Sequence, residues 1–459
     1  GCRHLPIYRE LVADLETPLS CYAKVARGPY SYLLESANQG GEKWSRFSII
    51  GLPARRILRM RGDRLTLTEN GALVRDELIE DPLAEIAQLQ EAYSYPSCPG
   101  MPNYTGGLVG YFGYDTVRYV EPKIKDSAPP DELGSADIVL MVSDDVIVFD
   151  NVKGRMHLVT HVSDLSPDQM NQAALRLDAM QGCLKGALPD EFVAPKVSPK
   201  LEEHDFISSY GEDQFKVDVA HLKEYIAAGD VMQVILSQRL SCSFEAAPLN
   251  LYRALRALNP SPYMYFMDLE TVQIVSSSPE ILARLEHGEV TVRPLAGTRR
   301  RGRSPEEDLE MERELRADPK EQAEHLMLID LGRNDIGRVC ETGTVAVSEM
   351  MTIERYAHVM HLASNVCGRL KPNLTAIDVL KATLPVGTLS GAPKVRAMEL
   401  IDAFEPVKRG IFGGAVGYLS WQGQMDTAIA IRTAVIQNGR LFVQAGAGIV
   451  ADSEPQLEW

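Results

Sequence analysis

The chain has 459 residues, long enough for two or more domain-sized units, and its apolar and charged fractions of 45% and 24% are those of ordinary globular proteins. Its 63 acidic and 47 basic side chains give a formal charge of −16, which argues against binding to nucleic acid or to an anionic membrane. No apolar run reaches the ~18 residues of a membrane-spanning helix. The seven scattered cysteines include no C-x-x-C pair, which favours reduced thiols in the cytoplasm over a disulfide framework or a zinc site.

Residues 1–165 are predicted to form a strand-rich N-terminal domain. Short β-prone runs alternate there with clusters of Gly, Pro and Asp, at 32–34, 47–50, 138–142 and, as a hairpin, at 144–149 and 156–159. Residues 166–204 contain a helical part followed by a charged stretch punctuated by prolines, and this segment is the predicted linker.

Residues 205–459 are predicted to form a second domain with a tighter pattern. Apolar residues from Phe215 to Ile226 have helical spacing, and Gly229 suits the position just beyond the helix end. Residues 231–240 have the pattern of a buried strand, and a further helix through Leu258 ends at Asn259-Pro260. Helices come singly and strands in groups, so the predicted fold class is α+β with antiparallel sheets.

The most informative helix is expected to begin at Asp318, with Asp318 as N-cap and Pro319 at the first helical position. One face of it then carries Glu321, Glu324, Leu328 and Leu331. Two carboxylates beside inward-facing leucines are costly unless a cation or protons neutralise them, and oxygen ligands are what Mg²⁺ prefers. The alternative is that these glutamates only complement the helix dipole; from periodicity alone we favour it by roughly two to one.

Two glycine-rich segments invite a ligand-binding interpretation. Residues 384–394 form a turn rich in Gly and hydroxyl groups before a helix, where free backbone N–H groups can hold an anion; an ordinary loop and cap is as good an interpretation. Residues 446–451 match a dinucleotide fingerprint by letter, but too little chain follows for that fold. We expect a bend there, whose small residues let a ligand approach the backbone.

Three single side chains are candidates with structural alternatives. His361 lies among apolar residues, where a histidine is more often part of the core than a catalyst. Arg432, in the β-prone run 428–435, suits a bidentate pair with a bound carboxylate or a structural salt bridge. Glu280, after three serines and a proline, is a candidate acid at a strand end or part of a helix cap.

The order of these segments resembles that of the chorismate-utilising enzymes. The resemblance covers nearly the whole chain and rests on residues 230–239, 277–280, 293–299, 324–335, the His361 segment, 387–394 and 446–448. It implies a two-domain α/β sandwich whose facing, mainly antiparallel sheets surround the active site.

Two positions distinguish the branches of that family. Where isochorismate and salicylate synthases carry a water-activating Lys this chain has Gln233, and where common aminodeoxychorismate synthases carry a nucleophilic Lys it has Ala296. The resemblance is therefore to the anthranilate synthase branch, in which ammonia adds to C2 of chorismate and pyruvate is then eliminated. The alternatives are an unusual aminodeoxychorismate synthase, an enzyme that stops at the aminated intermediate, and an amino-acid-binding regulatory subunit without catalysis.

The resemblance also implies roles for individual residues. Glu324 is expected to bind Mg²⁺ directly with support from Glu321, and Glu458 matches the first of two C-terminal glutamates of which the second would lie beyond Trp459. Glu280 is expected to be the general acid toward the C4 hydroxyl, and His361 to assist elimination or to orient the substrate.

The remaining site residues are expected to contact chorismate. Thr388 and Thr298, next to Gly297, are expected to hydrogen-bond it, and Arg432 to pair with its enolpyruvyl carboxylate. The amides of Gly446 and Gly448 are expected to support a carboxylate. Phe412 stands where many relatives have a Tyr, so one hydroxyl contact is lost.

A second site and a partner are implied as well. Residues 33–36 resemble the tryptophan feedback motif, although the local alternative is a strand ending in a turn. The expected allosteric tryptophan pocket comprises Leu34, Glu35, Ser36, Pro262, Tyr263, Met264, Val416 and Tyr418. No Cys-His amidotransferase arrangement stands out, so a glutamine amidotransferase small subunit is expected to supply ammonia within a hetero-oligomer.

Overall fold

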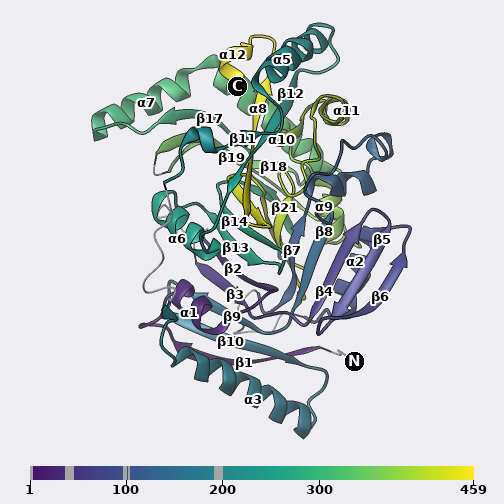
Figure 1. Ribbon diagram of the computed structural model, residues 1–459, viewed down its shortest axis with the longest axis vertical. Helices are drawn as coiled ribbons and strands as arrows, with labels where there is room; N and C mark the ends of the chain where they lie inside the picture. The colour runs from purple at the N-terminus through teal and green to yellow at the C-terminus, as the bar shows by residue number, and fades with distance from the viewer. Residues whose placement is uncertain (1–3, 37–45, 97–100, 102–103, 191–199, 357) are drawn as a thin grey trace.

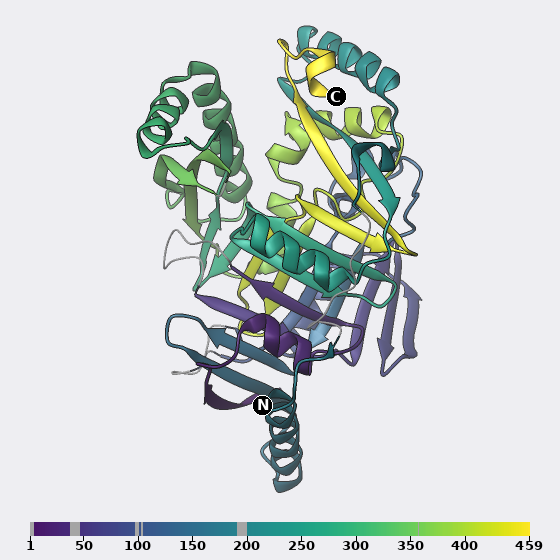
Figure 2. The same ribbon diagram turned by 60° about the vertical axis from the view of Figure 1, so that its left-hand side comes forward.

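The computed structural model describes residues 4–36, 46–96, 101, 104–190, 200–356 and 358–459. Two large antiparallel sheets, each of 12 strands within these residues, face each other, and helices cover their outer sides (Figures 1 and 2). The predicted α+β class with facing antiparallel sheets is confirmed. No helix in the described ranges is long and apolar enough to cross a membrane.

The first sheet combines strands from both ends of the chain. Its spatial order is β1 (Leu5–Val12), β10 (Arg155–Val162), β9 (Val146–Asp150), β3 (Phe47–Gly51), β2 (Ser31–Glu35), β13 (Tyr263–Asp268), β14 (Val272–Ser278), β23 (Thr433–Gln437), β24 (Arg440–Ile449), β12 (Gln233–Ser243) and β11 (Ile207–Ser208), with β20 (Gly391–Ala392) also beside β12.

The second sheet is equally mixed in sequence. Its order is β17 (Leu295–Arg300), β19 (Val359–Arg369), β16 (Glu289–Val292), β15 (Ile281–Glu286), β22 (Met425–Ile429), β21 (Ala415–Ser420), β7 (Gly107–Phe112), β8 (Ile138–Ser143), β4 (Arg56–Arg61), β5 (Arg64–Glu69) and β6 (Ala72–Leu78), with β18 (Ala346–Arg355) also beside β19. Both sheets thus receive strands from either side of residues 166–204; the predicted domain boundary there remains a prediction, and residues 191–199 of the predicted linker lie outside the described part.

A shared apolar layer joins the two sheets. Tyr32 of β2 is fully buried in it, beside Met141 of β8. The Tyr32 hydroxyl lies 2.9 Å from that of Tyr104 and 2.7 Å from Ser143 Oγ, so its polar end has partners. A Cβ at Gly51 would come within 1.9 Å of the Tyr32 ring, so glycine at that position makes room for the aromatic side chain.

Helices cover the outer face of the first sheet. Apolar side chains from α1 (Pro18–Val25), α3 (Pro167–Leu184) and α6 (Pro248–Leu258) pack in one cluster with those of the strands beneath. As predicted, α6 ends at Asn259 and α5 (Glu212–Ala227) is followed by Gly229 with a positive φ of 86°. α5 packs with α11 (Lys394–Phe404) and α12 (Pro455–Glu458) at the far end of the molecule (Figure 1).

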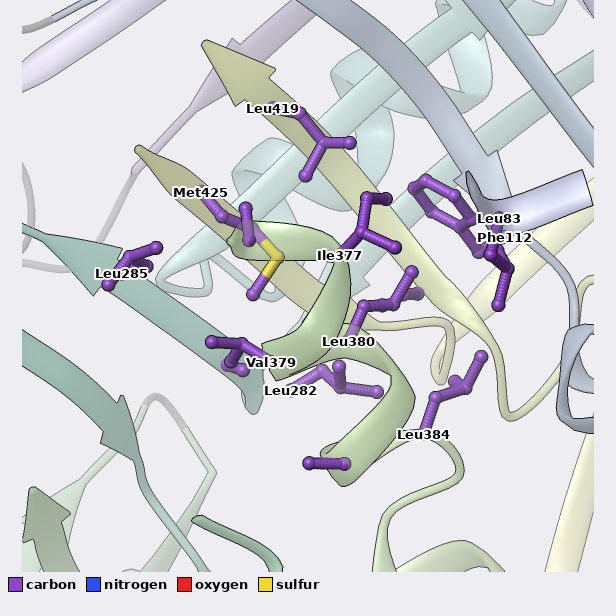
Figure 3. Close-up of a cluster of buried hydrophobic side chains, with 14 of the residues drawn as sticks. Leu83, Phe112, Leu282, Leu285, Ile377, Val379, Leu380, Leu384, Leu419 and Met425 are labelled. Carbon is purple, nitrogen blue, oxygen red and sulfur yellow. The ribbon is translucent and has the colours of Figure 1, made fainter. Parts of the chain in front are cut away.

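The outer face of the second sheet holds the largest core. α2 (Pro82–Ala92) and α9 (Ala376–Thr383) pack there, and Figure 3 shows Ile377 and Leu380 of α9 among Leu83, Phe112 and Leu419. All five of these side chains are at most 3% exposed. Truncating Leu380 to Ala would cost about 2–5 kcal/mol, because the rigid strands below cannot collapse into the cavity.

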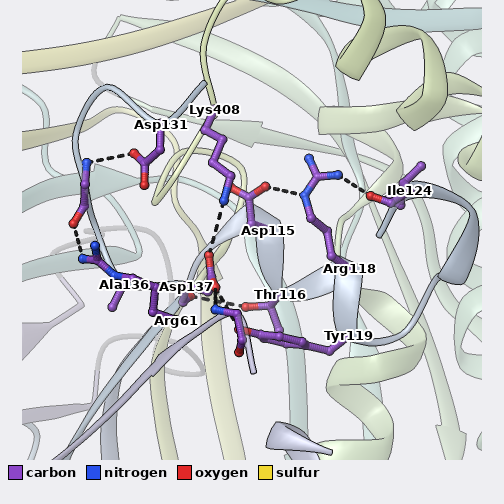
Figure 4. Close-up of polar contacts among 12 residues, drawn as sticks. Arg61, Asp115, Thr116, Arg118, Tyr119, Ile124, Asp131, Ala136, Asp137 and Lys408 are labelled. Atoms are coloured by element: carbon purple, nitrogen blue, oxygen red, sulfur yellow. Dashed lines mark hydrogen bonds and ion pairs between the residues drawn. The ribbon is translucent and has the colours of Figure 1, made fainter. Parts of the chain in front are cut away.

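Polar contacts fix the long connection between β7 and β8. This connection contains the short helices η1 (Tyr114–Tyr119) and η2 (Pro122–Ile124). Arg118 pairs with Asp115 at 2.6 Å, and Lys408 lies 3.8 Å from Asp137 (Figure 4). Arg118 also pairs with Asp402 of α11 at 2.7 Å. These ion pairs tie the connection to α11 and the segment after it.

Two helices follow β17 directly. These are α7 (Pro305–Ala317) and α8 (Pro319–Gly337). As predicted, Asp318 caps α8, and its carboxylate accepts hydrogen bonds from Lys320 N and Glu321 N at 2.9 and 3.3 Å. α8 packs on β17 and β19, which places its carboxylate-bearing face near the ends of these strands. The short helices α10 (Gly387–Ser390) and η3 (Glu203–Asp205) complete the described elements.

Candidate active site

Glu280 lies at the junction of β14 and β15 and is only 5% exposed. The Thr388 hydroxyl of α10 donates to its Oε1 at 3.3 Å, and the Leu295 backbone N–H donates to the same carboxyl. Burial raises the pKa of Glu280 to about 8, although these hydrogen bonds and the nearby Arg432 act in the opposite direction. A carboxyl group that stays protonated at neutral pH is equipped to donate a proton.

His361 of β19 is 9% exposed and faces the same region. Its Nδ1 lies 3.0 Å from the Gly297 carbonyl oxygen and 3.1 Å from Thr298 Oγ1. Because a carbonyl only accepts, Nδ1 carries the proton and Nε2 is the unprotonated nitrogen. Burial lowers the pKa of His361, which favours this neutral form. The structure therefore brings His361 and Thr298 into contact, with His361 Nε2 able to accept a proton.

Arg432 was expected within a strand, and this expectation is wrong. β22 ends at Ile429 and β23 begins at Thr433, so Arg432 lies in the turn between them with a φ of +50°. Its side chain is exposed, and within the described residues no carboxylate forms an ion pair with it. Arg432 is close enough to lower the pKa of Glu280 and also that of His361. The structural alternative, a salt bridge, is absent from the described part of the chain, which leaves the guanidinium available to a ligand.

The two predicted carboxylates on α8 differ in their surroundings. Glu321 pairs with Arg299 of β17 at 3.0 Å, and the same guanidinium binds Asp318 at 2.7 Å. Glu324 is half-buried, and no Lys, Arg or His in the described ranges forms an ion pair with it. Its pKa is raised by burial and by the Glu321 charge, while a hydrogen bond from Gln233 and the more distant charge of Lys320 oppose this effect. Among the described residues, Glu324 is thus the α8 carboxylate that has no cation in direct contact.

The third predicted metal ligand does not converge with the other two. Glu458 lies on α12, which packs against α5 (Figure 1). Among the described residues, three oxygens from Glu321, Glu324 and Glu458 do not all come within 4.8 Å of one another. The two α8 carboxylates and the Gln233 amide do lie together, because both Glu321 and Gln233 affect the pKa of Glu324.

A group of potential metal ligands does exist far from α8. His4, Asp144 and His161 offer ligand atoms that lie within 4.8 Å of one another. However, the two imidazole rings stack at 4.2 Å with an interplanar angle of 7°, so their in-plane lone pairs cannot both point at one ion. Asp144 is already paired with Arg56 at 3.1 Å. This arrangement fits a stacked polar cluster better than a metal site.

The segment containing Gly446 and Gly448 is a strand and not the expected bend. Both residues belong to β24, where Gly446 pairs with Ser237 and Gly448 with Ile235 of β12. A Cβ at Gly448 would come within 2.6 Å of the Gln233 amide nitrogen, and one at Gly446 within 2.7 Å of Ile235. These glycines make room for β12 side chains, among them the Gln233 amide that contacts Glu324.

A buried ion pair that the sequence patterns did not single out lies beneath α10. Arg409 and Glu405 are paired at 2.6 Å, with side chains only 1% and 2% exposed. Arg409 also donates to the Leu389 carbonyl at 2.5 Å and lies 5.7 Å from the ring of Phe412. The pair thereby supports the residue that follows Thr388, and sequence spacing gave no signal for it, because Glu405 and Arg409 lie beyond the end of α11.

A separate cavity of about 340 Å³ lies between the two sheets. Its walls come from β2 and β13 on one side and from β15, β21 and β22 on the other. All eight residues predicted for the second site line it: Leu34, Glu35, Ser36, Pro262, Tyr263, Met264, Val416 and Tyr418. The cavity volume falls within the range of small-molecule sites.

The polar groups of this cavity carry charges of both signs. Glu35 is held by Arg256 of α6 at 3.1 Å, and Arg284 pairs with Asp426 at 2.7 Å. The Ser36 hydroxyl is buried and has no hydrogen-bond partner among the residues that the structure describes. A buried hydroxyl without a partner, close to charged side chains, is suited to hydrogen-bond the ammonium or carboxylate group of a bound amino acid.

Comparisons with known proteins agree with this geometry. A family model described as chorismate binding enzyme matches residues 30–459. Anthranilate synthase component 1 of Pseudomonas putida is 54% identical over all of this chain and 93% of the relative, and that of Aquifex aeolicus is 47% identical over 99% and 92%.

Solved structures with the same architecture include two kinds of enzyme. Anthranilate synthase component I from Streptococcus pneumoniae TIGR4 has a TM-score of 0.81 and 37% identity, covering 98% of this chain and 96% of that one. The menaquinone-specific isochorismate synthase from Escherichia coli, at 19% identity, has a TM-score of 0.73 over 99% and 91% of the two chains, and so shares the fold.

Proposed function

The chain belongs to the chorismate binding enzyme family, and we propose that it catalyses the anthranilate synthase reaction, in which chorismate and ammonia yield anthranilate, pyruvate and water. The observation that carries this proposal is the buried carboxyl of Glu280, with its raised pKa, near Arg432 and near His361, whose pKa is lowered by burial. That set supplies an acid, an anion-binding cation and a base within one region, which the amination and elimination both need.

The first step uses Glu280 as general acid. Ammonia forms a bond to C2 of chorismate, the ring double bonds shift, and the C4–O bond breaks as Glu280 gives its proton to the departing hydroxyl, which leaves as water. The ammonium group formed at C2 then releases one proton, which balances the proton that Glu280 supplied. The burial that keeps Glu280 protonated makes this transfer favourable near neutral pH. Thr388 holds the carboxyl in place through its hydrogen bond.

The second step removes pyruvate and makes the ring aromatic. A base takes the proton from C2, the bond between C3 and the enolpyruvyl oxygen breaks, and the methylene carbon of the departing group gains a proton to give pyruvate. His361 Nε2 is the unprotonated nitrogen available for the C2 proton, because Nδ1 is held by the Gly297 carbonyl.

Substrate orientation comes from groups around this pair. Arg432 is proposed to bind the enolpyruvyl carboxylate, since no described carboxylate competes for it. Thr298 and the backbone at Gly297, Gly446 and Gly448 are proposed to contact the ring and its carboxylate. Phe412 adds an apolar wall and no hydroxyl contact.

We further propose that Mg²⁺ binds at α8. The residues present fit a divalent cation, because Glu324 is a half-buried carboxylate without a cationic partner among the described residues, and it is repelled by Glu321. Glu324 would hold the ion, with Glu321 and Gln233 supporting it and Glu458 as a further candidate ligand. When bound, Mg²⁺ would offset the charge of the ring carboxylate in a protein that is itself acidic.

The ammonia is proposed to come from a glutamine amidotransferase subunit. The designation component 1 of the relatives is consistent with a separate partner component. In this proposal the chain alone uses ammonium salts, and glutamine supports the reaction only after the partner is added.

The cavity between the sheets is proposed to bind tryptophan as a feedback inhibitor. Apolar walls from Pro262, Met264 and Val416 suit an indole ring, and Ser36 with the charged residues around it suits the ammonium and carboxylate groups. β15 begins directly after Glu280 and carries Arg284 into the cavity wall, so a ligand there can bias the position of the acid.

Incubation of the purified chain with chorismate, Mg²⁺ and ammonium tests the proposal. Anthranilate, identified by its fluorescence and mass, is expected, and EDTA should abolish its formation. A product that retains the enolpyruvyl group would instead indicate an aminodeoxychorismate-type enzyme or one that stops at the aminated intermediate. Tryptophan binding without any turnover of chorismate would indicate a regulatory subunit.

A further inference from the structure

A third carboxylate continues the inward-facing stripe of α8. Asp335 lies fourteen residues after Glu321 and eleven after Glu324, close to whole numbers of helical turns, so the three side chains share one face. Asp335 is 7% exposed and lines the same small cavity as Glu280 and Thr388. Glu324 and Asp335 are therefore about 16 Å apart along a rigid helix.

The charge of Asp335 is neutralised from within the chain. Lys394, the first residue of α11, donates to Asp335 Oδ2 at 2.7 Å, and the two side chains are 15% and 10% exposed. Burial lowers the pKa of Lys394 and raises that of Asp335, and the attraction between them opposes both effects. Arg338 adds a weaker contact to the other oxygen at 3.4 Å.

This pair connects the two elements that must be aligned for the reaction. α8 carries Glu324 near its start, and the segment from α10 to α11 carries Thr388, which holds Glu280. Between the two elements, packing is close: a Cβ at Gly387 would lie 2.6 Å from Leu331 of α8. Apolar packing sets this separation, and the Asp335–Lys394 ion pair adds a directional contact between the two elements.

We propose that Asp335 and Lys394 are positioning residues whose ion pair sets the axial position of α8 against the Thr388 turn. The pair thereby holds the carboxylates at the start of α8 in register with Glu280. This inference rests on the proposed function for its kinetic consequence, but the alignment itself is a property of the fold. Misplacement of reacting groups by about 1 Å costs on the order of 10²-fold in rate, which sets the size of the expected effect.

The informative variant removes the ion pair without leaving a buried charge. Asp335→Leu combined with Lys394→Met replaces it by apolar side chains of similar size, a change that is often neutral or stabilising. Asp335→Leu alone leaves the buried Lys394 charge without this partner, and Lys394→Met alone leaves Asp335 with only the weaker Arg338 contact, so each single variant should unfold more easily. Arg396→Met is the matched control, because Arg396 lies two residues along α11 and forms a part-exposed ion pair with Asp230 at 2.8 Å.

Two measurements on the double variant test the proposal. Its kcat for chorismate with ammonium is expected to fall about 10- to 100-fold, although its thermal midpoint matches or exceeds that of the parent. Hydrogen exchange in α8 and in residues 384–394 is expected to become faster than in the parent, while Arg396→Met changes neither property. Unchanged exchange in both segments, or full activity in a stable double variant, would overturn the proposal. If the parent makes no anthranilate, the proposed function fails, and the exchange measurement still decides whether the pair aligns the two segments.

Discussion

Replacing Glu280 by Gln is expected to stabilise the protein at neutral pH while removing most of its activity. Burial raises the pKa of the Glu280 carboxyl from 4.5 to about 8. In the unfolded chain this side chain ionises above pH 4.5, but in the folded protein it stays neutral up to about pH 8. Between pH 4.5 and about pH 8, folding therefore takes up a proton. The free energy of unfolding is greatest below pH 4.5 and falls as the pH rises toward about 8.

The magnitude follows from the width of that window. Each pH unit between 4.5 and about 8 costs about 1.4 kcal/mol, which amounts to about 3 kcal/mol at pH 7 and about 4 kcal/mol at pH 8, with a limit of about 5 kcal/mol at higher pH. Gln has nearly the same shape, carries no charge at any pH, and keeps an oxygen for the hydrogen bonds from Thr388 and Leu295. The variant should therefore match the parent near pH 4.5 and exceed it progressively toward pH 8.

Catalysis should change in the opposite direction. A positioned general acid contributes about 10²- to 10⁴-fold, so Glu280→Gln should lower kcat by that factor with ammonium as the nitrogen source. Urea denaturation followed by tryptophan fluorescence from about pH 5 to about pH 8 measures stability, and anthranilate fluorescence measures turnover. Glu289→Gln, which removes an exposed carboxylate at the start of β16, is the control and should give a flat difference across pH. A stability difference that does not grow with pH, or a less stable variant at pH 7, would refute the reasoning.

Three further variants separate the roles of the other groups. Arg432→Lys should raise the KM for chorismate about 10- to 100-fold, because an ammonium group cannot reproduce a bidentate contact; steady-state kinetics that leave KM unchanged would remove Arg432 from the substrate site. His361→Gln should slow anthranilate formation about 10²-fold and let the aminated intermediate accumulate, as seen by mass spectrometry of quenched reactions; equal loss without any intermediate would assign His361 to orientation. Ser36→Ala should raise the tryptophan concentration that gives half-inhibition about 5- to 10-fold, measured against the variant's own uninhibited rate, and an unaltered value would place the ligand elsewhere.

Much of the local structure is predictable because its causes are local. Asp318 with Pro319 marks the start of α8, and Gly229 follows α5, since caps depend on a few neighbouring residues. The strand runs at 32–34, 47–50 and 138–142 are likewise confirmed as β2, β3 and β8. The eight residues of the second cavity were predicted from their resemblance to a family motif, and all of them line it.

Other features were decided by residues that are distant in sequence. Arg432 has a β-prone neighbourhood, yet the chain turns there because β22 and β23 belong to different sheets. Gly446 and Gly448 match a ligand-binding bend, but β12 pairs along the whole segment and keeps it extended. In both places the conformation is set by pairing with strands that are distant in sequence, and not by the conformation that the local residues favour.

The sequence by itself determined the positions of α5, α6 and α8, the cap at the start of α8, and which chemical groups face the same side of that helix. Only the tertiary structure decided which ionisable groups of the site are buried and which have a partner of opposite charge. It buried Glu280, gave Glu321 a partner in Arg299 and Asp335 a partner in Lys394, and left Glu324 and Arg432 without one in the described part of the chain. The reason is that the protonation of a side chain depends on its exclusion from water and on charges within a few ångströms. Both are set by the packing of different segments against one another, and residue spacing within one segment does not reveal them.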